Sequence, residues 1–196
     1  MRILVIGANG QVGRTAVDAL AGHEVISASR SSEPSVDVTD SASVEHLFAS
    51  VGQIDAVIVA VGEVPFRSLD ELSRSDYEAA FRGKVLSQLD VVRIGTSYVR
   101  DGGSITLTSG ILSREPIATG AAASLANGAI ESFVVAAATE LPRGIRINAV
   151  SPSVLADAPS YHSSFPGFVP VSSHRVGQAF AKSVLGVQTG QVYPVD

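Results

Sequence analysis

The sequence predicts an α/β fold of the Rossmann type, a doubly wound parallel sheet forming a single domain over residues 1–196. Three features predict it. An apolar run at the start of the chain leads into a glycine-rich loop, and short β-branched runs then alternate with longer helical stretches. The two central runs are apolar throughout instead of alternating with polar residues. That last pattern is typical of parallel strands that helices cover on both faces.

The expected elements follow from these runs in chain order. Strands are expected at 3–6, 24–28, 56–60, 104–108, 146–150 and 191–195, and helices at 11–21, 41–50, 75–99, 121–141 and 176–185. Asp40 or Ser41 can cap the second helix, and Pro142 with Gly144 ends the fourth. The stretch 153–173 holds three prolines and is predicted to be a loop or lid rather than a linker between domains.

Composition excludes several classes of function. The chain has 196 residues, 45% of them hydrophobic, and can therefore build one sizeable core. Its net charge of −5 disfavours a nucleic-acid backbone as partner. With no cysteine and no metal-ligand spacing among the histidines, we expect no metal site. The apolar runs are too short to cross a membrane and no targeting segment is visible, so a cytoplasmic protein is expected.

The glycine loop follows one predicted strand and opens a predicted helix, which is the context in which such loops bind a pyrophosphate. Gly7 permits the tight turn, Gly10 lets backbone N–H groups approach the phosphates, and Gly13 lets the helix pack on the strand. The spacing is G-x-x-G-x-x-G, and a tight turn without a ligand is the alternative. The predicted contacts with a dinucleotide are Gly7, Asn9, Gly10, Gln11, Val12 and Gly13.

The end of the second strand distinguishes the two nicotinamide dinucleotides. An acidic residue there would bind a ribose 2′-hydroxyl, whereas an Arg would accept a 2′-phosphate. The run Ser29-Arg30-Ser31 is followed by no acid until Glu33. An Arg with neighbouring hydroxyls donates charge-assisted hydrogen bonds to phosphate. We therefore expect NADP(H) rather than NAD(H), with a solvated surface Arg30 as the alternative.

Beyond these motifs, the chain resembles the short-chain dehydrogenase/reductase family over nearly its whole length. Residues 36–40, VDVTD, resemble the family's adenine-side Asp motif, and 59–62, VAVG, its Asn-Asn-Ala-Gly turn without the asparagines. Residues 103–109, GSITLTS, resemble the strand that carries the catalytic Ser. The most specific match is 143–152, RGIRINAVSP, although Ser153 replaces the family's Gly. The resemblance implies cofactor contacts from Asp37, Val38, Ala60, Val61, Gly62, Pro152 and Val154.

The resemblance fails at the catalytic positions. The family uses a Tyr as general acid, a Lys four residues later and a Ser that orients the carbonyl. When the helix is aligned with the family without gaps from Glu140 and the segment 143–152, these positions hold Ala123, Asn127 and Gly110. Residues 115–139 contain neither Tyr nor Lys. Asn127 could still bond a ribose hydroxyl. The replacement candidates are Ser109 and Lys84 first, then Ser124, Tyr161 and His162, with ordinary packing or surface roles as the alternative for each.

The sequence therefore predicts an NADP(H)-binding oxidoreductase with a degenerate active site that transfers hydride to or from a small carbonyl or alcohol substrate. The alternative is a catalytically silent NADP(H)-binding sensor or dimeric scaffold. The stretch 121–138 is small and apolar on nearly every face, and such a helix must be covered on all sides. Together with the helix-packed interfaces that the resemblance implies, it predicts a homodimer or homotetramer.

Overall fold

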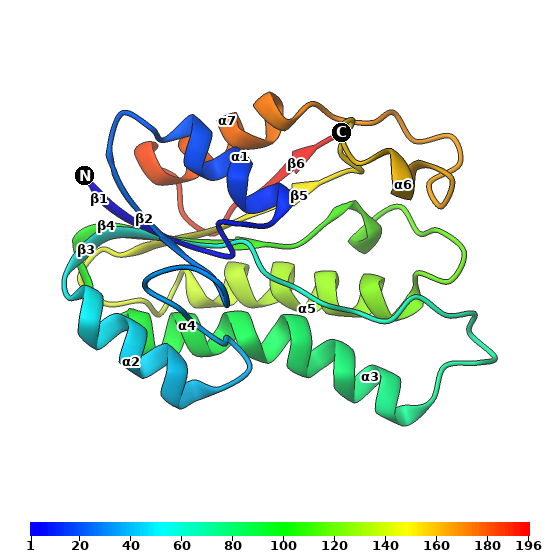
Figure 1. Cartoon of the computed structure of the whole chain (residues 1–196), viewed down its shortest axis with the longest axis horizontal. Helices are drawn as coiled ribbons and strands as arrows, with labels where there is room; N and C mark the ends of the chain where they lie inside the picture. The colour runs from blue at the N-terminus through cyan, green and yellow to red at the C-terminus, as the bar shows by residue number, and fades with distance from the viewer.

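Six strands form one all-parallel sheet in the order β2-β1-β3-β4-β5-β6 (Figure 1). They are described by a computed structural model that covers residues 1–196. The strands are β1 Arg2–Ile6, β2 Glu24–Ala28, β3 Ile54–Val59, β4 Val99–Thr108, β5 Arg146–Pro152 and β6 Val192–Val195. The chain runs outward from β1 to β2 and then returns to β3 on the other side of β1. A crevice therefore opens beyond the carboxyl ends of β1 and β3, where doubly wound sheets bind ligands.

Helices cover both faces of the sheet (Figure 1). The helices α1 Gln11–Ala19 and α7 Ser173–Leu185 lie on one face. The other face carries α2 Ser41–Val51, α3 Arg74–Ala80, the π-helical turn η1 Phe81–Leu86, α4 Ser87–Gly95 and α5 Ala121–Ala137. Two short helices, η2 Ile111–Ser113 and α6 Pro159–His162, lie in the loops after β4 and β5. None of the helices is both long and apolar enough to cross a bilayer.

Alternation along the central strands divides the core into two layers. In β1, Leu4 and Ile6 pack with Phe48 beneath α2, whereas Ile3 and Val5 pack with Phe180 of α7. All six side chains are fully buried. Because both faces of the strand are covered, its sequence is apolar at every position from Ile3 to Ile6.

The predicted fold class is confirmed, and the differences lie at element ends, in one divided helix and in one short additional helix. Asp40 is the cap of α2, because its carboxylate accepts the Ala42 N–H at 3.0 Å. The expected helix 75–99 is divided by the π-turn η1 and ends at Gly95, since Val99 already pairs with Ile54 in the sheet. The helix expected to reach 141 ends at Ala137, before the proline that cannot continue it. The expected loop 153–173 contains α6.

Candidate active site

The glycine loop connects β1 to α1 and approaches neighbouring backbone too closely for side chains. Gly7 has φ +85°, and a Cβ there would lie 2.3 Å from the Ala60 carbonyl oxygen. A Cβ on Gly13 would lie 2.1 Å from the Gly7 carbonyl oxygen. A Cβ on Gly10, at the N-terminus of α1, would lie 3.3 Å from the same oxygen and would meet no other atom within 4 Å. Two of the glycines are therefore required by packing, while Gly10 leaves open space in front of the helix.

The loop forms one wall of a cavity of about 430 Å³, called here the glycine-loop cavity. It brings together most of the residues predicted to contact a dinucleotide, namely Gly7, Asn9, Gly10, Ser29, Arg30, Ser31, Asp37, Val38, Ala60, Val61 and Gly62. Gln11, Val12 and Gly13 do not line it, and Val12 instead packs against the core beneath α1. The stretches before α1, after β2 and after β3 thus meet at one site, as expected for the carboxyl end of a parallel sheet.

The far end of this cavity contains the groups that would distinguish a ribose 2′-phosphate from a ribose 2′-hydroxyl. The Asn9 amide donates to the Ser29 hydroxyl at 2.8 Å and to the Ser31 hydroxyl at 3.3 Å. Hydrogen bonds from Thr39, helped by the charge of Arg30, hold the pKa of Asp37 below its usual value. Arg30 is exposed and takes part in none of the ion pairs of the molecule. Its guanidinium is therefore free to meet an anionic ligand.

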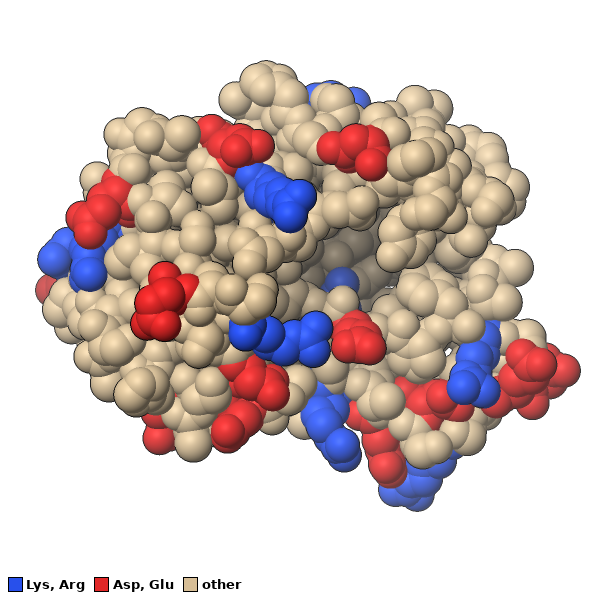
Figure 2. All heavy atoms as spheres, viewed as in Figure 1, with Lys and Arg blue, Asp and Glu red and all other residues tan.

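A second cavity of about 230 Å³, called here the Lys84 cavity, adjoins the first, and Gly62 lines both. Figure 2 shows a hollow in this face of the molecule with largely uncharged walls and basic atoms at its floor. Its apolar lining comes from Val64, Phe66, Ile111, Leu112, Ala123, Pro152, Val154 and Phe165. Its polar side chains are Lys84, Asn127 and Ser153. Lys84 is thus the one charged residue that lines this cavity.

Lys84 reaches the cavity from the π-turn η1, an irregularity that is frequent at functional sites. Its aliphatic chain lies where a Gly62 side chain would be, since a Cβ on Gly62 would be 2.9 Å from Lys84 Cγ and Cδ. Its ammonium donates to the Ser109 carbonyl oxygen at 3.0 Å. Burial lowers the pKa of Lys84 to about 8, while the negative charge of Glu131 acts in the opposite direction.

The other candidates for the missing Tyr lie outside this cavity. The Ser109 hydroxyl is buried and donates to Glu131 at 2.8 Å, so only the Ser109 carbonyl faces Lys84. Ser124 does not line the cavity, and Tyr161 is exposed on α6. The His162 ring lies 2.8 Å from the Leu155 carbonyl oxygen. Of the five candidates, the structure brings Lys84 alone to the crevice.

Some site residues were not anticipated from the sequence. Ser153, Phe66 and Phe165 line the Lys84 cavity. Phe66 and Phe165 lie on irregular loops with no motif to mark them, and their positions depend on how those loops fold. Glu131 did carry a signal, because it is the sole charged residue in the apolar stretch 121–138. A lone charge on a buried helix needs a partner, and here Arg114 is 3.1 Å away.

The cavities contain polar atoms that fit a dinucleotide. Asn127 Oδ1 and Ser153 Oγ are buried and have no hydrogen-bond partner, although nearly all buried polar groups have one. Both belong to side chains that line the Lys84 cavity, next to the glycine-loop cavity. A ribose hydroxyl or an amide group of a ligand that spans both cavities would satisfy them. The open space in front of Gly10 and the N-terminus of α1 fits the phosphates of the same ligand.

This fold, with a glycine loop at the switch point of a parallel sheet, defines a Rossmann-type protein with a crevice for a dinucleotide. A family model described as enoyl-(acyl carrier protein) reductase matches residues 4–188. The chain belongs to the short-chain dehydrogenase/reductase family.

Solved structures similar to this chain cover it completely. The protein lin1944 from Listeria innocua is 42% identical over 100% of both chains, with a TM-score of 0.98. A small-chain dehydrogenase crystallised in complex with NADPH is 28% identical, with a TM-score of 0.88, over 100% of this chain and 96% of that one.

Curated relatives match over a shorter length. The glucose and ribitol dehydrogenase homolog 2 of Arabidopsis thaliana is 29% identical over 110 residues, 56% of this chain and 38% of that protein. An uncharacterized oxidoreductase of Methylorubrum extorquens is 27% identical over 125 residues, 63% of this chain and 50% of that protein. The matched segment thus spans half or less of the length of these two relatives.

Proposed function

We propose that this chain is an NADP(H)-dependent oxidoreductase that transfers hydride to or from a small carbonyl or alcohol, with Lys84 as proton donor in place of the missing Tyr. The observation that carries the proposal is the position of Lys84. Its ammonium is the single charged group in the lining of a small apolar cavity that adjoins the glycine-loop cavity. The residues of helix α5 that line this cavity are Ala123 and Asn127, and neither side chain can donate a proton as a general acid.

Residues of both cavities would bind the cofactor. The glycine loop and the N-terminus of α1 would hold the pyrophosphate, and Arg30 with Ser29 and Ser31 the 2′-phosphate. Asn127 and Ser153 would bond the nicotinamide riboside. The similar small-chain dehydrogenase that was crystallised with NADPH supports this assignment. Bound nicotinamide supplies or accepts the hydride.

Lys84 has the properties that the proton transfer requires. As a carbonyl is reduced, negative charge develops on its oxygen, and a positioned acid must supply a proton. With a pKa of about 8, Lys84 is mostly protonated at neutral pH and yet releases its proton readily. The Ser109 carbonyl orients the ammonium, so Ser109 contributes through its backbone and not through its hydroxyl. The apolar walls favour a substrate whose remaining substituents are small and apolar.

The test is a search for turnover with NADPH. A panel of small aldehydes, ketones and quinones is mixed with protein and NADPH, and loss of nicotinamide absorbance is followed. Turnover that disappears in Lys84→Met would support the proposal. Tight NADPH binding without any turnover would favour the second candidate, a catalytically silent NADP(H) sensor or dimeric scaffold, which the small Ala123 at the acid position supports.

Arg30→Ala is expected to reduce the affinity for NADPH while leaving that for NADH unchanged. Because Arg30 is exposed, solvent screens the ion pair, and we expect a loss of about 1.5 kcal/mol, or roughly tenfold in Kd. Calorimetric titration of both cofactors measures the preference. Arg175→Ala, which removes an exposed charge on α7, is the control. An unchanged ratio of the two affinities in Arg30→Ala would rule out the assignment of the 2′-phosphate to this residue.

The protein is expected to form a homodimer or homotetramer through the helical layer that contains α5. Three large apolar side chains are exposed there, Leu86 at 52%, Leu125 at 44% and Val135 at 57%. Light scattering at micromolar concentration should give a multiple of the chain mass, and the pair Leu125→Glu with Val135→Glu should shift it toward the monomer. Val187→Glu, at a side chain that is 90% exposed after α7, should change nothing. A monomeric wild type would contradict the prediction.

A further inference from the structure

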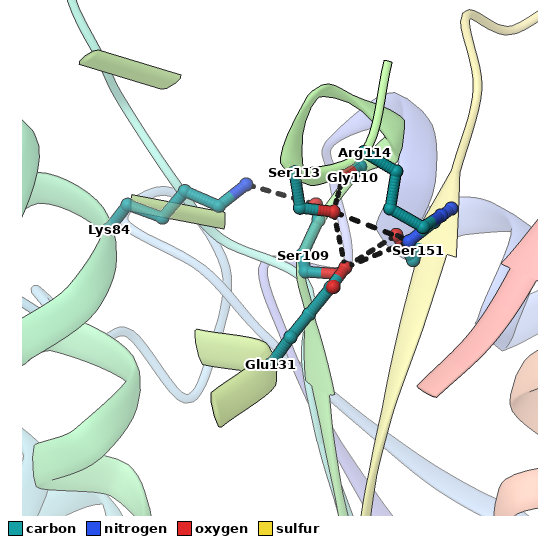
Figure 3. Close-up of polar contacts among 7 residues, drawn as sticks. All are labelled: Lys84, Ser109, Gly110, Ser113, Arg114, Glu131 and Ser151. Carbon is teal, nitrogen blue, oxygen red and sulfur yellow. Dashed lines mark hydrogen bonds and ion pairs between the residues drawn. The ribbon is translucent and has the colours of Figure 1, made fainter. Parts of the chain in front are cut away.

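A partly buried network of polar side chains lies next to the Lys84 cavity and is centred on Glu131 of α5 (Figure 3). Its Oε1 atom accepts hydrogen bonds from Ser109 at 2.8 Å, Ser113 at 2.7 Å and Ser151 at 2.9 Å. Arg114 donates to the same oxygen at 3.1 Å. The Glu131 side chain is only 17% exposed. Donors from the end of β4, from η2 and from β5 therefore converge on one carboxylate.

Ser109 connects this network to Lys84. Its hydroxyl donates to Glu131, and its carbonyl oxygen accepts the Lys84 ammonium at 3.0 Å. Figure 3 shows the Lys84 and Glu131 side chains reaching Ser109 from different elements. The bond to Glu131 holds the residue that orients Lys84, so removal of the carboxylate would loosen the contact that aims the ammonium into the cavity.

Charge connects the two residues as well. Glu131 is the carboxylate whose field favours the protonated form of Lys84 and opposes the effect of burial on its pKa. Glu63, on the loop after β3, lines the glycine-loop cavity and not the Lys84 cavity. Arg114 lies on the opposite side of Glu131 from Lys84 in Figure 3, where its charge partly offsets that of the carboxylate. A glutamine in place of Glu131 would keep the packing and lose this field.

We propose that Glu131 is a positioning residue for Lys84: through Ser109 it holds the carbonyl that receives the ammonium, and its carboxylate stabilises the charged amine across the same residue. This proposal rests on the proposed function, in which Lys84 donates a proton. After each transfer the neutral amine must regain a proton from solvent through the open cavity, and the nearby carboxylate favours that return.

The composition of the chain allows a direct test. Lys84 and Lys182 are its two lysines, so lysine labelled with ¹³C at Cε gives one NMR signal for each residue. The signal of Lys84 should titrate with a midpoint of about 8 in the protein without cofactor. In Glu131→Gln the midpoint should fall by about half a pH unit or more, because an opposite charge nearby favours the charged form. In the control Glu140→Gln, an exposed carboxylate just beyond α5, it should not move.

A second variant should shift the titration midpoint of Lys84 in the opposite direction, and this test does not depend on whether Glu131→Gln folds. Arg114→Met removes the cation that partly offsets Glu131, so the midpoint of Lys84 should rise. A purely structural role of the network would not move the midpoint in opposite directions in the two variants. An unchanged midpoint in a folded Glu131→Gln, or no rise in Arg114→Met, would overturn the proposal. These titrations need no turnover, so an inactive protein would contradict the proposed function without affecting this result.

Discussion

Replacement of Lys84 by Met is expected to lower NADPH-dependent turnover by about 10² to 10⁴-fold, the range that general acid catalysis contributes. Methionine keeps the length and apolar character of the chain that lies against Gly62 and removes only the ammonium. Binding of NADPH should therefore persist, and the loss should fall on kcat. Turnover is followed by nicotinamide absorbance and binding by calorimetry, so that the two effects are separated.

The pH dependence provides a second measure of the same group. Reduction needs the ammonium form of Lys84, whose pKa is about 8. The rate of reduction should therefore be constant at neutral pH and fall as the pH rises through about 8, whereas oxidation of the alcohol, which needs the free amine, should rise over the same interval.

Lys182→Met is the matched control for Lys84→Met, because it removes the other lysine. The Lys182 ammonium lies 4.9 Å from the centre of the Tyr193 ring, and α7, which carries Lys182, is on the opposite face of the sheet from η1 (Figure 1). It should leave turnover and its pH profile unchanged. Full turnover in Lys84→Met would assign the proton to another group, and Tyr161 on α6 would be the next residue to replace.

Gly10→Val is expected to abolish dinucleotide binding while the fold survives. A valine at the N-terminus of α1 would project into the space that the pyrophosphate needs, and its Cβ would lie 3.3 Å from the Gly7 carbonyl oxygen, a tight contact that a shift of a few tenths of an ångström relieves. Calorimetry with NADPH should show no binding, and thermal unfolding should change little. By contrast, substitution of Gly13 would disrupt the loop itself, because its Cβ would lie 2.1 Å from the Gly7 oxygen.

Gly22→Val supplies the matched control for Gly10→Val. A Cβ at Gly22 meets no atom within 4 Å, and the residue is exposed at the end of the turn after α1. The same glycine-to-valine change there should leave NADPH affinity unaltered. Undiminished binding in Gly10→Val would mean that the loop is a turn required only by packing.

The sequence by itself determined the order and type of the main elements and the location of the glycine-loop cavity. Both are local properties. Continuous apolar runs identify buried parallel strands, and a glycine triplet after the first strand identifies the loop. Because all strand ends of a parallel sheet point the same way, residues 29–31 could be placed near the glycine loop before any contact was known, and the family resemblance implied that 37–38 and 60–62 lie there as well.

Tertiary structure alone separated the catalytic candidates. The sequence ranked Ser109 beside Lys84, yet the direction of each side chain depends on contacts between distant segments. The Ser109 hydroxyl turns to Glu131, 22 residues away, while Lys84 reaches across 25 residues to the Ser109 carbonyl. The π-turn that carries Lys84 has no marker in the sequence, and the pKa of a lysine depends on the atoms packed around it. Sequence periodicity fixes which face of an element is buried, but only the packed chain decides which polar groups meet there.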